Sequence, residues 1–234
     1  MRAPVAIIIP TLNAAAFLPA CLSSLMEGLE AGLIRELIVS DGGSTDATGA
    51  TAQAWGAKVL HGAPSRGGQL RRGCAAAEGT WLLIVHADTV LAPGWTEAVQ
   101  AHLAQTDTAG WGQRAFDHGG PAARLVAGWA NLRSRLGLPY GDQSLLISRQ
   151  LYAQTGGYPD QPLMEDVAMA RALKGHLTGL NLRAVTSAEK YRTQGWLRRG
   201  GRNLATLLRY FAGLDVEQLA QRYRRCRSAK KPFA

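Results

Sequence analysis

The sequence predicts an α/β fold, with a mostly parallel central sheet flanked by helices and a C-terminal helical extension. Short apolar runs alternate with helical segments over residues 5–85, at the spacing of parallel strands joined by right-handed crossovers. The 234 residues are 47% hydrophobic and 18% charged, which is typical of a globular chain with one substantial core. Near the C-terminus, leucines and arginines fall on opposite faces of a helical projection.

Four short apolar runs predict the buried strands of the first half. They occupy residues 5–9, 36–40, 57–60 and 81–85. Three helices are expected between them: one with Pro19 in its first turn that ends near residue 29, one after cap candidates at 44–46 that ends at residue 54, and one over residues 69–77.

The second half mixes helices with shorter strands. Helices are expected over residues 93–103, 122–136 and 166–174, and strands over 110–116 and 144–147. No repeat or linker divides the chain. We therefore expect residues 1–195 to form the main domain and residues 196–234 to form a basic extension of the same compact unit.

The C-terminal segment predicts an amphipathic helix. Its apolar face carries Leu204, Leu207, Leu208 and Phe211, and its opposite face carries Arg198, Arg202 and Arg209. Gly200 and Gly201 are expected to delay the start of this helix to about Arg202. A last helix is expected from a capping residue at Asp215 to about Tyr223.

Charge and cysteine usage limit the kinds of partner and compartment. The net charge of +9 indicates an anionic partner such as phosphate, nucleic acid or a membrane surface, or simply an arginine-rich surface. Three widely spaced cysteines predict neither a disulfide framework nor a metal cluster, which fits a reducing bacterial cytoplasm. The chain begins without a signal-peptide pattern, and no apolar run approaches the roughly 20 residues of a membrane span. Peripheral contact with the inner membrane face stays an alternative.

Two carboxylates follow predicted strands. Asp41 and Asp88 each stand at the C-terminal end of an apolar run, where open α/β sheets bind their ligands. Asp41 could accept a hydrogen bond from a flat base, because Gly42 and Gly43 would let the base approach the backbone. A local turn is the alternative. Asp88 suits a hard cation such as Mg²⁺ or Mn²⁺, and His86 falls on the same side of an extended chain.

Two further segments carry candidate chemistry. Residues 65–72 place three arginines around a glycine pair, a composition that favours phosphate but lacks the Lys-Ser/Thr ending of a P-loop. A solvated loop that opens a basic helix is the alternative. Glu165 and Asp166 stand at a predicted helix start, where acidic residues are common because of the helix dipole. The same dipole would keep a general base ionised.

Taken together, these segments resemble the inverting family 2 glycosyltransferases, which have the GT-A fold with its Rossmann-like sheet. The matching stretches are IIIPTLN, ELIVSDGGSTDAT, SRGGQLRRG, LIVHADT and LMEDVAMARALK, in family order over residues 5–174. YGDQS, GGYP, LMEDV and HADT resemble more closely a bacterial subgroup of short family 2 enzymes associated with radical-SAM and selenium-related gene clusters.

The resemblance implies transfer of a sugar from a nucleoside-diphosphate sugar, with UDP as the expected nucleotide, to an acceptor that is lipid-linked or a small molecule. It implies a nucleotide site at Pro10, Thr11, Asn13, Asp41, Gly42, Arg66, Arg72, His86 and Ala87. Asp166 would be the general base, supported by Glu165, and Asp88 would bind Mn²⁺ or Mg²⁺. Candidates for contact with the donor sugar or the acceptor are Asp142, Gln143, Tyr191 and Arg192.

One departure from the family pattern concerns the metal. His86 stands where the D-x-D motif has its first aspartate, and no histidine follows His176 to serve as a late metal ligand. Metal binding would then rest on Asp88 and the diphosphate.

Two other functions are weaker alternatives. A nucleotidyltransferase would carry a glycine-rich loop with lysine after the first strand, which this chain lacks. A nucleic-acid-binding protein would use the +9 charge, but the aromatic residues do not interleave with the arginine clusters, so no nucleic acid is expected as a partner. The C-terminal helix has three interpretations: packing on the domain, docking on anionic lipid, or a dimer contact.

Overall fold

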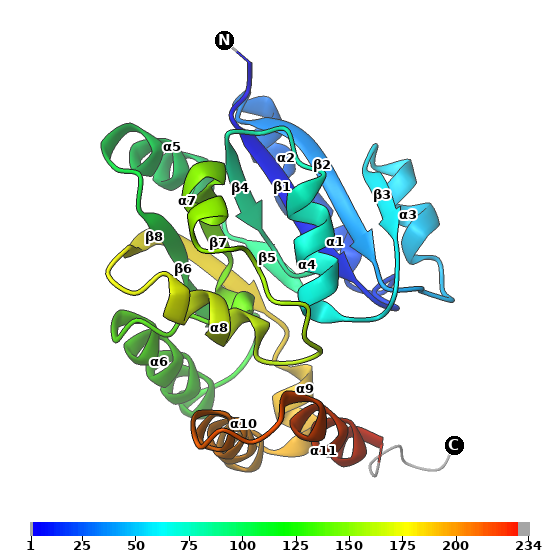
Figure 1. The fold of residues 1–234 in the computed structure, drawn as a ribbon, viewed down its shortest axis with the longest axis vertical. Helices are drawn as coiled ribbons and strands as arrows, with labels where there is room; N and C mark the ends of the chain where they lie inside the picture. Colours follow the sequence, from blue (N-terminus) through cyan, green and yellow to red (C-terminus); the bar gives the residue numbers. More distant parts are fainter. Residues whose placement is uncertain (1, 229–234) are drawn as a thin grey trace.

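The computed structural model describes residues 2–228, in which eight strands form one sheet (Figure 1). The strands are β1 (Val5–Thr11), β2 (Ile34–Asp41), β3 (Lys58–His61), β4 (Trp81–Ile84), β5 (Thr89–Leu91), β6 (Ala109–Phe116), β7 (Leu145–Ser148) and β8 (Leu177–Thr186). Their order in the sheet is β3-β2-β1-β4-β7-β6-β8-β5. The first four are parallel, β7 runs antiparallel to both neighbours, β6 and β8 are parallel, and β5 is antiparallel to β8. The expected mostly parallel sheet is confirmed.

Helices flank this sheet and extend beyond it. They are α1 (Leu18–Ser24), α2 (Met26–Glu30), α3 (Thr48–Ala54), α4 (Arg66–Ala75), α5 (Trp95–Gln105), α6 (Pro121–Arg135), α7 (Arg149–Gln154), α8 (Glu165–Ala172), α9 (Glu189–Gln194), α10 (Trp196–Phe211) and α11 (Val216–Ser228), with a 3₁₀ turn η1 (Gly141–Gln143). Helices α9, α10 and α11 gather at the end of the molecule where β1, β2 and β4 finish, and form the expected C-terminal helical part (Figure 1).

Alternating side chains of the central strands divide the core into two layers. In β1, Ile7 and Ile9 point into one cluster with residues of α1 and α5, whereas Ala6 and Ile8 point into the other with residues of α4, α7 and α8. Every residue of β1 is buried. A strand covered by helices on both faces must be apolar throughout, which is why the uninterrupted run of residues 5–9 predicted it.

Several expected helix boundaries differ from the structure. The first helix is two, α1 and α2, which meet at Leu25. The helix expected from residue 69 begins at Arg66, because the Ser65 hydroxyl caps it by accepting from the Gly68 N–H at 3.3 Å. The last helix continues past Tyr223 to Ser228, although its expected cap is confirmed: Asp215 accepts from the Gln218 N–H at 2.9 Å.

The expected start of α10 near Arg202 is wrong. The helix begins at Trp196, so Gly200 and Gly201 lie inside it. Two glycines in a helix cost about 1 kcal/mol each relative to alanine. Packing of Trp196 offsets part of that cost, because its ring lies 5.0 Å from the ring centres of Phe116 and Tyr191 and holds the first turn of the helix.

Strands β5 and β8 were not expected. From Leu180 onward β8 alternates buried and outward-facing residues, with Leu182, Ala184 and Thr186 turned inward. Gly179 and Asn181 are poor strand formers and mask this alternation in the sequence. Within the described residues, no helix has both the length and the apolar character needed to cross a membrane.

Candidate active site

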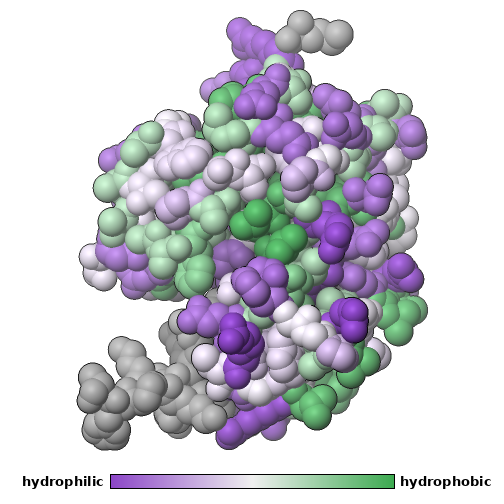
Figure 2. All heavy atoms as spheres, turned by 180° about the vertical axis from the view of Figure 1, so that it is seen from behind, coloured by the Kyte–Doolittle hydropathy of each residue, from purple (hydrophilic) through white to green (hydrophobic). Residues whose placement is uncertain are grey.

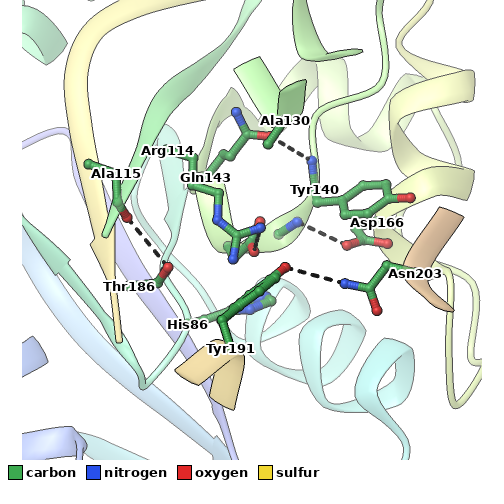
Figure 3. A network of polar contacts seen from close by, with 12 residues as sticks. His86, Arg114, Ala115, Ala130, Tyr140, Gln143, Asp166, Thr186, Tyr191 and Asn203 are labelled. Carbon is green, nitrogen blue, oxygen red and sulfur yellow. Dashed lines mark hydrogen bonds and ion pairs between the residues drawn. The ribbon is translucent and has the colours of Figure 1, made fainter. Parts of the chain in front are cut away.

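A cavity of about 270 Å³ lies beyond the end of β4, between the sheet and the C-terminal helices. Its lining comes from distant parts of the chain: Arg66, His86, Asp88, Arg114, Tyr140, Asp142, Leu163, Met164, Glu165, Asp166, Thr186, Ser187, Tyr191, Gln194, Arg199, Asn203, Thr206 and Tyr223. Four carboxylates and three arginines therefore meet in one space. Figure 3 shows Arg114, Asp166 and Tyr191 with their side chains directed toward it.

Asp166 is held by two backbone N–H groups. Its Oδ2 accepts from the Gly141 N–H at 2.9 Å (Figure 3). Its Oδ1 accepts from the Val167 N–H at 2.8 Å. Met164, with φ of 63°, bends the chain so that Asp166 enters the first turn of α8. Glycine at position 141 lets the turn pack closely on His86, because a Cβ there would lie 2.4 Å from His86 Nε2. The turn η1 and the start of α8 thus fix one carboxylate at the cavity wall.

Glu165 forms a buried ion pair beneath the cavity. Its side chain is 1% exposed, and its Oε1 lies 3.1 Å from Arg66 Nε, whose own side chain is 45% exposed. Arg66 Nη2 also lies 2.6 Å from Nδ1 of the buried His86. Burial raises the pKa of Glu165 to about 7, since the Arg66 charge offsets it only in part and the Asp166 charge adds to it. Glu165 and His86 together hold the Arg66 guanidinium at the cavity.

The opposite wall is cationic and aromatic. Arg114 Nη1 lies 2.7 Å from Asp142 Oδ2, and the Arg114 guanidinium lies 4.6 Å from the Phe116 ring centre. The guanidinium carbons of Arg114 and Arg199 lie 5.5 Å and 5.0 Å from the Tyr191 ring centre. The Tyr191 hydroxyl accepts from Asn203 Nδ2 at 3.4 Å (Figure 3). These contacts orient two guanidinium groups toward a space that can accommodate negative charge.

Asp41 lies at the end of β2 and does not line this cavity. Its oxygens accept from the hydroxyls of Thr11 and Ser44 and from the N–H groups of Gly43 and Ser44, at 2.5–2.9 Å. The turn that was the alternative for this residue is therefore present. Burial raises the pKa of Asp41, but these hydrogen bonds outweigh it and hold the pKa below its usual value.

The loops after β1 and β2 are tied to each other. Asn13, with φ of 50°, accepts from the Thr45 N–H at 2.9 Å, and Gly42 donates to the Thr11 carbonyl at 2.9 Å. A Cβ at Gly42 would lie 2.9 Å from Gln69 Oε1. Pro10 and Thr11 are the last two residues of the buried strand β1. The predicted base-binding residues are thus together at one sheet edge, separate from the cavity lining.

Three predicted site residues do not line the cavity. Arg72 donates to the Asp41 carbonyl at 3.0 Å. Gln143 is fully buried, where it accepts from Ser134 Oγ at 2.6 Å and donates to the backbone of β6. Arg192 is exposed on α9 and does not line the cavity. Ala87 is buried, and its neighbours His86 and Asp88 both line the cavity.

Four further residues line the cavity although the sequence did not indicate them: Arg114, Tyr140, Arg199 and Asn203. Arg114 stands within an expected strand, where an internal arginine signals a buried partner such as Asp142. Arg199 was expected to precede its helix, so its position could not be projected.

Asp88 is the candidate ligand for a divalent cation. Among the residues that the structure describes, no three His, Cys, Asp or Glu side chains are grouped for metal binding. Asp88 does line the cavity, and Mg²⁺ and Mn²⁺ are commonly bound by one or two carboxylates with substrate phosphates as further ligands. The residues therefore fit a cation that arrives with a phosphorylated substrate.

Comparison with known proteins identifies the family of this chain. The model of the family described as Glycosyl transferase family 2 matches residues 6–154. A PGL/p-HBAD biosynthesis glycosyltransferase of Mycobacterium tuberculosis is 41% identical over 99 residues, which cover 39% of this chain and 38% of that protein. The chain thus aligns with well under half the length of this curated relative.

Solved structures show a similar fold. Glucosyl-3-phosphoglycerate synthase from M. tuberculosis, in complex with Mn²⁺, UDP and glucosyl-3-phosphoglycerate, is 23% identical with a TM-score of 0.54, covering 79% of this chain and 70% of that one. S. aureus TarS in complex with UDP is 17% identical with a TM-score of 0.60, covering 80% and 62%. Because the family model matches more than half of the residues of this chain, the chain belongs to the family described as Glycosyl transferase family 2.

Proposed function

We propose that the cavity binds a nucleoside-diphosphate sugar, with UDP as the nucleotide, and that the enzyme transfers the sugar to an acceptor hydroxyl with inversion. The observation that carries this proposal is the convergence of Asp88 and Asp166 with three arginines at the carboxyl edge of the sheet. The two structures of similar fold bind UDP, as their descriptions state, which supports the choice of nucleotide.

In this proposal Asp166 is the general base. Its backbone hydrogen bonds hold the carboxylate at the cavity wall, where it would take the proton of the acceptor hydroxyl. The acceptor oxygen then forms a bond to the anomeric carbon as the bond to the diphosphate oxygen breaks. The electron pair leaves with the nucleoside diphosphate, and Arg66, Arg114 and Arg199 offset its charge. Attack opposite the leaving group inverts the anomeric configuration.

We propose that the nucleoside lies over the ends of β1 and β2. Asp41, Asn13 and Gly42 stand there on loops that hydrogen bonds hold together. Asp41 would accept from the base, while Thr11 and Pro10 form the floor. His86 and Ala87 link this edge to the cavity, and Arg72 acts by bracing Asp41.

We propose that Asp88 holds Mn²⁺ or Mg²⁺ together with the diphosphate. The cation would neutralise charge on the leaving group. The Mn²⁺ named for the synthase of similar fold supports this proposal.

YGDQS, GGYP and LMEDV support membership of the radical-SAM- and selenium-associated bacterial subgroup. We propose that residues 1–195 and residues 196–228 form one unit, since Asn203 and Thr206 of the second part line the cavity. Residues 229–234 of the expected extension lie outside the described residues.

Slow hydrolysis of a panel of UDP-sugars, followed by proton NMR, tests this function without an acceptor. We expect one donor to release UDP, and its sugar to appear first as the anomer opposite to that of the donor. First formation of the same anomer would refute inversion. Absence of hydrolysis for every nucleotide sugar, with and without Mn²⁺, would count against the donor class.

A further inference from the structure

Two neighbouring helices expose most of the large apolar side chains on the surface. Twelve such side chains are exposed among the described residues, and eight of them belong to α6 and α10 or to the residue that ends α6. We name these eight residues the docking face: Leu125, Trp129, Leu132, Leu136, Leu197, Leu204, Leu208 and Phe211. Their exposed fractions range from 41% at Leu204 to 81% at Leu197, so each of these side chains leaves much apolar surface in contact with water.

The spacing places four of these side chains on one side of each helix. On α6 they recur at i, i+4, i+7 and i+11, and on α10 at i, i+7, i+11 and i+14. The other sides are occupied: Ala123 and Ala130 of α6 are buried, and Leu207 of α10 packs against the α8 region. The helices contact each other, and a Cβ at Gly119 would lie 3.2 Å from the Trp196 ring.

Figure 2 shows hydrophobic surface at the lower right, on the side of the molecule where α6 and α10 lie in Figure 1. The surroundings of this surface are cationic. Neither residues 118–141 nor residues 190–214 contain a single Asp or Glu. Arg124 and Arg135 of α6 and Arg198 and Arg209 of α10 are exposed.

We propose that the docking face binds the surface of a membrane that contains anionic lipids. Apolar side chains of an amphipathic helix enter the boundary between headgroups and acyl chains, and arginines beside them contact lipid phosphates. A second copy of this chain is the poorer occupant, because a two-fold contact would oppose one set of arginines to another with no carboxylate between them. Lying on the surface also fits the lack of a membrane-spanning helix among the described residues.

Helix α10 connects this face to the cavity. Arg199, Asn203 and Thr206 line the cavity, while Leu197, Leu204 and Leu208 belong to the docking face. A membrane bound at one side of α10 therefore lies one helix away from the reaction space. Under the proposed function, this position suits an acceptor hydroxyl carried by a lipid.

Sedimentation of the full chain with vesicles tests the docking face and requires no donor or turnover. We expect binding to phosphatidylcholine vesicles that contain phosphatidylglycerol, and little binding to phosphatidylcholine alone. Leu197→Ser with Leu208→Ser, or Arg198→Gln with Arg209→Gln, should reduce the partition coefficient roughly tenfold or more. The controls, Leu29→Ser on α2 and Arg149→Gln on α7, replace exposed residues of the same types elsewhere on the surface and should bind normally.

The variants replace exposed side chains, so their thermal unfolding midpoints should stay close to that of the unchanged protein, which separates lost docking from lost folding. Three results would overturn the proposal: equal binding to neutral vesicles, unchanged binding of the variants, or no binding to either lipid. A dimer in sedimentation equilibrium that the leucine variant dissociates would assign the face to a second copy instead.

Discussion

Asp166 is the side chain on which the proposed chemistry depends most directly. We expect Asp166→Asn to lower turnover by about 10²–10⁴-fold, because that is the typical contribution of a general base. The amide oxygen can still accept from the Gly141 N–H, so the cavity and the affinity for UDP should be preserved. Steady-state kinetics and calorimetry with UDP measure the two quantities. Turnover near that of the unchanged enzyme would show that another group accepts the proton.

Glu165 predicts a pH dependence of stability. Its folded pKa of about 7 exceeds the ordinary value of 4.5, so folding favours the protonated form. The resulting stability is fully present below pH 4.5 and is lost as the pH rises through 7. Glu165→Gln mimics the neutral group at every pH. Above pH 7 it should exceed the unchanged protein in unfolding free energy by on the order of 3 kcal/mol, and below pH 4.5 the two should be equal.

Chemical denaturation across this pH range measures the difference, with Glu30→Gln on the exposed end of α2 as the control. A Glu165→Gln variant that is less stable above pH 7 would mean that the ionised pair with Arg66 stabilises the fold.

At the scale of elements, the turn η1 connects the two halves of the site. A Cβ at Gly141 would lie 2.4–2.5 Å from the His86 ring, while Gly141 also holds Asp166 through its N–H. Gly141→Ala must therefore move η1 or His86. We expect turnover to fall by up to about 100-fold, since a displacement of an ångström can cost that much.

Gly128→Ala is the matched control for this change, because a Cβ at Gly128 on α6 meets no atom within 4 Å. It should leave turnover unchanged. Equal activity of both variants would show that the close contact between η1 and His86 has no role in positioning Asp166.

Elements that depend on local pattern were predictable, whereas those that depend on distant packing were not. The apolar run at residues 5–9 and the Asp215 cap carry their structural causes within a few residues. The start of α10 does not, because Trp196 packs against the distant Phe116 and so holds the first turn ahead of two glycines. Strand β8 likewise exists through its pairing with β6 and β5, despite Gly179.

In the molecule as a whole, some site residues could likewise be predicted from local pattern, whereas others depend on distant packing. Asp88, Glu165 and Asp166 could be predicted to meet, because strand ends and helix starts converge at one edge of such a sheet. Asp41 was expected in the same pocket but lies outside the cavity lining, within its own turn. Arg199 enters the cavity only because the C-terminal helices fold back over it, which no local pattern records.

We propose that this cavity is a nucleotide-sugar site completed by a cation that the substrate brings. Isothermal calorimetry of UDP binding, with and without Mn²⁺, measures this coupling. We expect Mn²⁺ to strengthen UDP binding and Mn²⁺ alone to bind weakly. Asp88→Asn should remove the gain from Mn²⁺ and leave metal-free binding of UDP intact. Failure of every nucleoside diphosphate to bind, in the presence or absence of the metal, would contradict it.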